Sequence, residues 1–139
     1  MARETPGVPD EDVTAVQERN MAAVRTWIDA YNAQDIEGLA VVADAAFRVE
    51  DPATGTHLAG PDRFADVARG VVRMYPDRRI SVTTMIPLGA TAVAVQGDWD
   101  GTAAEDTPTG AHPGDRVHHI ESMLIELSDS RITLMRIYR

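Results

Sequence analysis

One short stretch decides the fold: Phe47-Arg48-Val49-Glu50-Asp51-Pro52. Phe47 and Val49 alternate with polar residues, which is the pattern of a strand with one buried face. Pro52 removes a backbone donor and biases Asp51 towards an extended conformation, so the strand is expected to end there. A carboxylate at such a strand end can point into the space that helices and sheet enclose. Asp51 is therefore a candidate base, and the alternative is a side chain that only caps the next turn.

Two helices are predicted before this strand. Between residues 11 and 32, apolar side chains recur at three- and four-residue intervals from Val13 to Tyr31, which indicates a helix with one buried face. Asp35 is a suitable N-cap for a second, shorter helix. Residues 1–10 hold prolines and a glycine among polar residues and are predicted to form a disordered leader. A single domain is expected over residues 11–139.

A third helix and four strands are predicted after it. The third helix starts at Gly60-Pro61-Asp62, because proline is tolerated in a first turn, and it ends at Pro76. Residues 52–60 and 102–115 are predicted to be loops, and the second could close over a pocket as a lid. Alternating apolar residues predict strands at 79–86, 91–101, 116–127 and 131–138. Helices segregated from an antiparallel sheet indicate an α+β fold.

The composition of the 139 residues excludes several classes of function. The absence of cysteine excludes disulfides, thiolate metal sites and thiol nucleophiles. A net charge of −9 argues against a nucleic-acid-binding surface, and a neutral small molecule is a better fit. The chain shows no membrane-length apolar run and no signal peptide, so a cytoplasmic protein without membrane contact is expected. The four histidines lack helical metal-site spacing, so no metal is predicted. No cofactor is expected either.

Five motifs, in this order, resemble landmarks of the nuclear-transport-factor-2-like superfamily: Trp27–Asp35, Phe47–Pro52, Tyr75–Arg79, Asp100–Thr102 and Pro108–Gly110. The first is similar to the first-helix signature of the superfamily, and the second to the V-E-D-P strand end of its ketosteroid isomerases. The other three look like landmarks of its SnoaL-like polyketide cyclases. The resemblance implies a cone-shaped barrel, in which a curved antiparallel sheet wraps on three N-terminal helices around an internal pocket. It also implies a homodimer through the outer face of the sheet.

The resemblance assigns a general base to Asp51, which stands where ketosteroid isomerases and several polyketide-tailoring relatives carry theirs. Those isomerases also use a tyrosine of the first helix and a protonated aspartate of a later strand. Here the tyrosine position holds Trp27, and the aspartate position falls at or next to Met123. Neither side chain can release a proton to the substrate. Glu121 is two residues from Met123 on the same face, and it is the remaining candidate acid.

Two histidines are adjacent on one predicted strand and must point to opposite faces. His119 shares the face of Glu121 and Met123, so it is a candidate pocket residue. A His119–Glu121 pair could hold a proton near neutral pH. His118 is expected to face outward.

The walls of the pocket are predicted from strand alternation and from residue size. On strand 91–101 the apolar face is expected inside, which leaves Asp98 and Asp100 outside. Arg136 and Tyr138 are on the same face of the last predicted strand. If this face points inward, Arg136 is a buried cation, and if it points outward, Arg136 is a surface arginine. The predicted substrate-binding residues are Trp27, Tyr31, Phe47, Phe64, Met74, Trp99, Met123, Arg136 and Tyr138.

These features together predict a cofactor-free cyclase or isomerase of secondary metabolism. Its substrate would be a hydrophobic, polyketide-like small molecule, and its catalysis would use acids and bases or a template. Two alternatives stay open. An epoxide hydrolase or ether-ring-forming cyclase needs a second carboxylate, which only Glu121 could supply. A non-catalytic small-molecule-binding module needs no acid at all.

Overall fold

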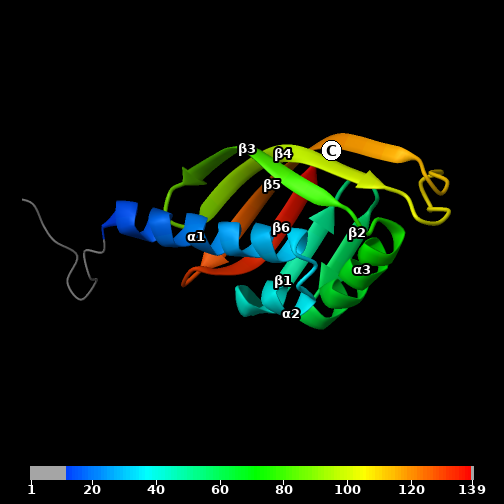
Figure 1. Cartoon of the computed structure of the whole chain (residues 1–139). Helices are drawn as coiled ribbons and strands as arrows, with labels where there is room; N and C mark the ends of the chain where they lie inside the picture. The colour runs from blue at the N-terminus through cyan, green and yellow to red at the C-terminus, as the bar shows by residue number, and fades with distance from the viewer. Residues whose placement is uncertain (1–11, 139) are drawn as a thin grey trace, which may run out of the picture.

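The computed structural model describes residues 12–138 and contains three helices and six strands (Figure 1). The helices are α1 (Val13–Asn32), α2 (Ile36–Val41) and α3 (Pro61–Met74). The strands are β1 (Ala43–Asp51), β2 (Thr56–Ala59), β3 (Arg79–Leu88), β4 (Ala92–Thr102), β5 (Arg116–Ser128) and β6 (Arg131–Tyr138). All predicted helices and strands are present. The segment 52–60, predicted as a loop, contains the additional strand β2, and the predicted leader 1–10 lies outside the described residues.

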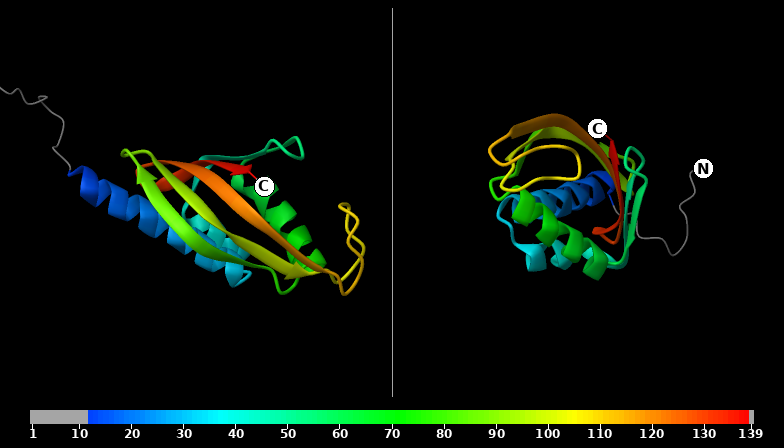
Figure 2. Two further views of the ribbon diagram at one scale, coloured as in Figure 1. Left: turned by 90° about the horizontal axis from the view of Figure 1, so that it is seen from above. Right: turned by 90° about the vertical axis from the view of Figure 1, so that its right-hand side faces the viewer.

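The strands form one curved sheet in the order β2-β1-β6-β5-β4-β3. Every neighbouring pair is antiparallel except β1 and β6, which run parallel. The sheet is therefore mixed, where a purely antiparallel sheet was predicted. No hairpin joins β1 to β6, so the alternation within each strand carries no information on their relative direction. The sheet is open, with β2 and β3 at its edges, and it curves around the helices (Figure 2).

Helix α1 packs along the concave side of the sheet (Figures 1 and 2). Its N-cap is Asp12, whose carboxylate accepts a hydrogen bond from the backbone N–H of Thr14 at 3.1 Å. In its middle, Asn20 is 2% exposed and donates to the carbonyl of Ala90 at 3.0 Å. At its end, the Asn32 side chain makes two hydrogen bonds with the backbone of Ile80, at 2.8 and 2.9 Å. Asn32 thus fixes the start of β3 against the helix.

A β-bulge in β6 exchanges the two faces of that strand. Ile132 pairs with Leu127 and Leu134 pairs with Glu126, so Thr133 is an extra residue without a partner in the register. Beyond it, Arg136 pairs with Leu124 and Tyr138 with Ser122, which lie on the outer face. The expectation that Arg136 and Tyr138 line an internal pocket is therefore wrong, because the bulge adds one residue to the alternation.

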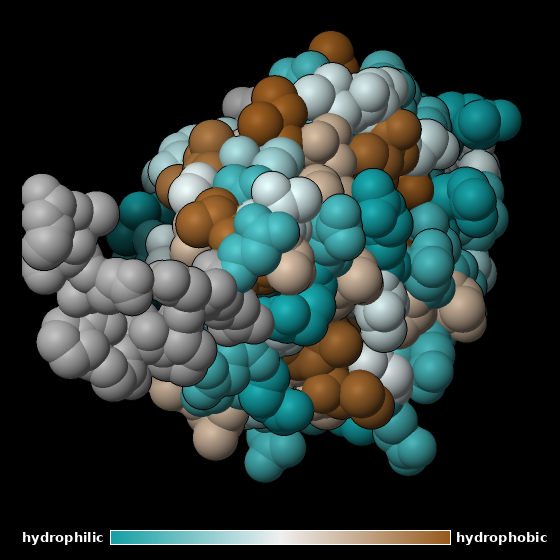
Figure 3. All heavy atoms as spheres, turned by 90° about the vertical axis from the view of Figure 1, so that its left-hand side faces the viewer, coloured by the Kyte–Doolittle hydropathy of each residue, from teal (hydrophilic) through white to brown (hydrophobic). Residues whose placement is uncertain are grey.

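No helix among residues 12–138 has the length and apolar character that a membrane crossing requires. Figure 3 views the end of the molecule where α1 begins, and on its visible part the hydrophobic residues form small separate groups among hydrophilic ones.

Candidate active site

Asp51 ends β1 and is only 5% exposed. It follows Phe47 and Val49 in the alternation of the strand, and both of these side chains are buried in the core. Its Oδ1 also accepts a hydrogen bond from the backbone N–H of Ala53 at 3.2 Å. The side chain thus caps the following turn and is buried with the inward residues of β1. The position of Asp51 is therefore compatible both with a candidate base and with a cap of the next turn.

Glu121 and His119 lie together on the inward face of β5. Glu121 is 5% exposed, and its Oε1 is 3.3 Å from Nε2 of His119. The imidazole stacks on the indole of Trp99, with ring centroids 5.0 Å apart and planes 8° apart. His118 faces the other way and bonds Asp98 at 2.9 Å, as the alternation predicted.

The two buried carboxylates occupy the same end of the sheet. Glu50 of β1 pairs with Arg136 of β6, so the next residue, Asp51, lies beside Ile137. Ile137 in turn pairs with Met123 of β5, so Asp51 and Met123 lie at the same height on strands β1 and β5, with β6 between them. Two strand spacings separate their backbones by about 10 Å. Glu121 is two residues further along β5. Because the sheet is concave on this side, both carboxylates can face one ligand.

A tyrosine hydroxyl lies between the helix and this end of the sheet. Tyr31 is in the last turn of α1, and its hydroxyl accepts a hydrogen bond from Nε1 of Trp99 at 2.9 Å. Burial raises the pKa of Tyr31, the Trp99 hydrogen bond and the charge of Arg78 oppose that rise, and the charge of Glu121 adds to it. The hydroxyl is therefore protonated at neutral pH and can donate a hydrogen bond.

Arg78 is a buried residue that the sequence reading did not select. It is 2% exposed, and its guanidinium lies over the Tyr31 ring with Cζ 4.3 Å from the centroid. Its Nη2 donates to the Tyr31 carbonyl at 3.0 Å. One signal was available: alternation back from the buried Ile80 places Arg78 inward and Arg79 outward.

Aromatic rings fill the space between α1, α3 and β1. The indole of Trp27 stacks on Tyr31 with centroids 5.4 Å apart, and it lies 5.9 Å from Phe64. Phe64 meets Phe47 edge-on at 5.4 Å. Met74 and Met123 also belong to this core. Most of the predicted wall residues therefore come together, and their side chains pack against one another.

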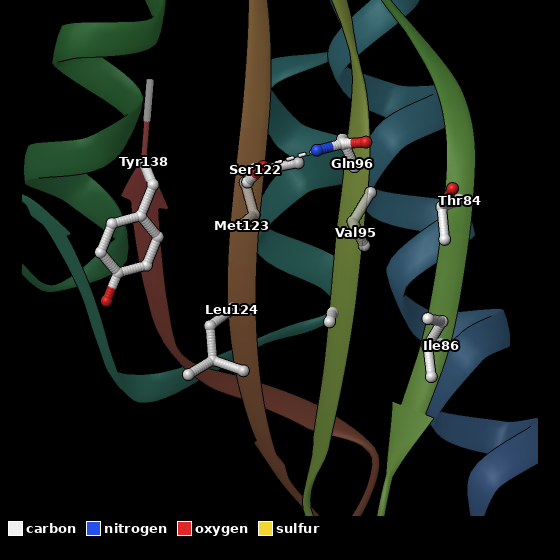
Figure 4. A pocket seen from close by; sticks show the side chains of 9 residues that line it. Thr84, Ile86, Val95, Gln96, Ser122, Met123, Leu124 and Tyr138 are labelled. Carbon is white, nitrogen blue, oxygen red and sulfur yellow. Dashed lines mark hydrogen bonds between the residues drawn. The ribbon is translucent and has the colours of Figure 1, made fainter.

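The outer face of the sheet carries a shallow groove of about 350 Å³ (Figure 4). Thr84, Ile86, Gln96, Leu124 and Tyr138 point out of the sheet there, on the side away from the helices. Beside it, Nε of Arg136 bonds Oε1 of Glu50 at 2.9 Å, so Arg136 is a surface arginine with a carboxylate partner. Among residues 12–138, no three acidic or histidine side chains gather in a metal-binding arrangement.

Residues 24–135 match the SnoaL-like domain, which is most of the chain. The chain belongs to the SnoaL-like family. Its fold is the cone of the nuclear-transport-factor-2-like superfamily, as the motifs predicted, with the sheet left open. No curated protein matches the chain.

Several solved structures share this fold at low sequence identity. A proposed SnoaL-like polyketide cyclase from Jannaschia sp. CCS1 is 18% identical, with a TM-score of 0.78 over 99% of this chain and 90% of that one. IdmH, a proposed polyketide cyclase from Streptomyces antibioticus, is 17% identical, with a TM-score of 0.74 over 86% and 90%. A Catenulispora acidiphila protein with a ketosteroid isomerase-like fold, in complex with trimethylamine, is 15% identical, with a TM-score of 0.72 over 84% of each chain. At these identities, the likeness establishes the fold alone.

Proposed function

We propose that this SnoaL-like protein is a cofactor-free cyclase or isomerase of secondary metabolism, acting on a hydrophobic, polyketide-like small molecule. Membership of the SnoaL-like family supports a role of this kind. The observation that carries the proposal is the burial of two carboxylates, Asp51 and Glu121, each 5% exposed, at one end of the concave sheet. Desolvated carboxylates beside apolar walls are suited to proton transfer.

Each side chain has a definite task in the proposed reaction. Asp51 takes a proton from a C–H bond next to a carbonyl group, and the negative charge moves to the carbonyl oxygen. The Tyr31 hydroxyl, which Trp99 orients, donates a hydrogen bond to that oxygen. The His119–Glu121 pair returns a proton to the rearranged or cyclised product. The substrate reaches these groups when the aromatic side chains of the interior move apart.

Asp51→Asn tests the base without removing the turn cap, because the asparagine Oδ1 still accepts from Ala53. The probe is 2-tetralone, whose α C–H exchanges with deuterium when a base acts on it, and ¹H NMR follows the exchange. The wild-type protein should accelerate this exchange, and the variant should lose roughly 100-fold or more of that rate.

The matched control is Asp44→Asn at the other end of β1. Asp44 makes the same kind of bond, from its Oδ1 to the N–H of Ala46 at 2.9 Å. This variant should exchange 2-tetralone at the wild-type rate. Wild-type exchange by Asp51→Asn would refute the assignment of the base.

The paired carboxylates also favour a second candidate, the opening of an epoxide. One carboxylate would activate water while the other protonates the ring oxygen, so both would be needed. Styrene oxide rather than 2-tetralone would then be turned over, and both Asp51→Asn and Glu121→Gln would stop the reaction.

A further inference from the structure

The buried guanidinium of Arg78 has no role in the proton transfer proposed above. An arginine side chain stays positively charged at every physiological pH. Arg78 is nevertheless 2% exposed, so water does not solvate that charge. Burying a charge is strongly unfavourable unless hydrogen bonds and an opposite charge compensate it.

The compensation that Arg78 finds within the protein is incomplete. Its Nη2 donates to the Tyr31 carbonyl at 3.0 Å, and the Tyr31 ring contributes a cation–π contact. Its Nε and Nη1 are buried and have no hydrogen-bond partner. Among residues 12–138, no carboxylate lies within ion-pair distance of the guanidinium. Two of its three nitrogens are therefore left for an acceptor from outside the chain.

Other donors surround the same tyrosine. The Tyr31 hydroxyl accepts from Trp99, which leaves its own proton to be donated. The indole of Trp27 stacks on the Tyr31 ring, and its Nε1 is a second buried donor without a partner. Arg78 and Trp27 together thus present three buried nitrogens that can donate and have no acceptor, which suits a site for an oxygen ligand.

We infer that Arg78 anchors an anionic oxygen of the substrate, a carboxylate in the simplest case. The inference rests on the proposed function only in placing the substrate in the interior. It narrows the substrate class to aromatic or polycyclic molecules that carry one acidic oxygen. The apolar part of such a molecule would lie against Trp27, Phe64 and Phe47, while its oxygen meets the guanidinium.

Because the protein is negatively charged overall, a preference for an anionic ligand over a neutral one would indicate a local positive charge at the binding site. At a net charge of −9, long-range electrostatics repel an anion rather than attract it. A higher affinity for an anion than for its neutral analogue therefore requires a local cation at the binding site.

The experiment compares 2-naphthoate with the neutral 2-naphthalenemethanol by isothermal titration calorimetry. The wild-type protein should bind the anion at least about ten-fold more tightly, since a charge-assisted hydrogen bond is stronger than a neutral one. The chain has two tryptophans, so ¹H–¹⁵N spectra show two indole signals, and both should shift if the probe is in the interior.

Arg78→Gln should bind both probes equally, whereas the control Arg79→Gln should keep the wild-type preference. Arg79 is the adjacent, exposed arginine, so the control makes the same change in net charge. Arg78→Lys keeps the charge on a different geometry and should reduce the preference. If Arg78→Gln does not fold, the wild-type preference and its reduction in Arg78→Lys decide the question.

Three results would overturn the inference: no preference for the anion in the wild type, indole signals that do not move, or an equal loss in Arg79→Gln. No turnover is involved in this measurement. A failure of the Asp51 test would therefore leave the inference intact, and a failure here would leave Asp51 as the proposed base.

Discussion

At the scale of single residues, Asp51 combines a structural contact with a position suited to chemistry. Its Oδ1 caps the turn to Ala53, yet the side chain is buried with the inward residues of β1. A carboxylate has two oxygens and several lone pairs, so the backbone hydrogen bond from Ala53 does not by itself prevent the side chain from accepting a proton. A cap and a base are therefore compatible roles for one aspartate.

Its neighbour Glu50 makes a pH-dependent contribution to stability. The hydrogen bond from Arg136 is the main reason that the pKa of Glu50 lies below its ordinary value of 4.5. A lowered pKa in the folded state stabilises the fold while the carboxylate is ionised, and this contribution is lost as the pH falls through the folded pKa. Acidification from neutral pH to about pH 3 should therefore lower the unfolding free energy of Glu50→Gln by less than it lowers that of the wild type.

Urea denaturation at the two pH values measures this difference. The effect should be small, because the pair is partly exposed to solvent. Arg136→Gln should give the same reduction, since either substitution removes the pair. An acid sensitivity of Glu50→Gln equal to that of the wild type would contradict the assignment.

Much of the candidate site could be predicted from alternation and motif position alone. Asp51, His119 and Glu121 are where the sequence placed them, and His118 faces outward as expected. Arg78 was missed because a charged residue beside a second arginine is usually on the surface. Alternation back from Ile80 indicates its direction, but the partner that holds it inside is Tyr31, 47 residues away, which no local pattern identifies.

At the scale of secondary structure, the bulge at Thr133 limited the prediction of the pocket walls. The apolar residues of β6 change from Ile132 and Leu134 to Met135 and Ile137, so its sequence does not alternate regularly and does not by itself assign a face to Arg136. The register is set by the partner strand β5, and one extra residue reverses the orientation of Arg136 and Tyr138. The β4 strand lacks such a bulge against β5, and its inward face was predicted correctly.

Gly97 controls how closely β4 approaches β3. A Cβ at this position would lie 2.6 Å from the backbone oxygen of Ser81, which is too close for any side chain. Gly97→Ala should therefore force the two strands apart and lower the unfolding free energy by about 1–3 kcal/mol. Urea denaturation measures the change.

Gly70→Ala is the matched control, because nothing lies within 4 Å of a Cβ at that helical position. It should raise the unfolding free energy by about 0.5–1 kcal/mol, since alanine is the better helix former. A neutral effect of Gly97→Ala would show that β3 can shift without loss.

At the scale of the whole molecule, the outer face of the sheet is proposed as a dimer interface. Large apolar residues are exposed there, among them Ile86 at 49%, Ile120 at 57% and Tyr138 at 47%. Ile86 and Tyr138 line the groove of Figure 4. Covering such residues is the usual way to remove apolar surface from water.

Ile86→Asp should convert a dimer into a monomer, because a second copy would then bury an unpaired charge. Analytical ultracentrifugation measures the mass. The control Val41→Asp changes an equally apolar residue, 65% exposed on α2, and should leave the dimer unaffected. A wild-type protein that sediments as a monomer would refute the proposed interface.

The parallel pairing of β1 with β6 has a consequence for the order of folding. Val49 pairs with Met135, so the hydrogen bonds between these two inner strands of the sheet join segments that lie 86 residues apart in the sequence. During synthesis, β1 emerges from the ribosome long before its central partner has been made. The N-terminal helices therefore have only an incomplete sheet to pack against until β6 has been made. Contacts between residues so far apart in the sequence form slowly, and they slow the completion of the sheet.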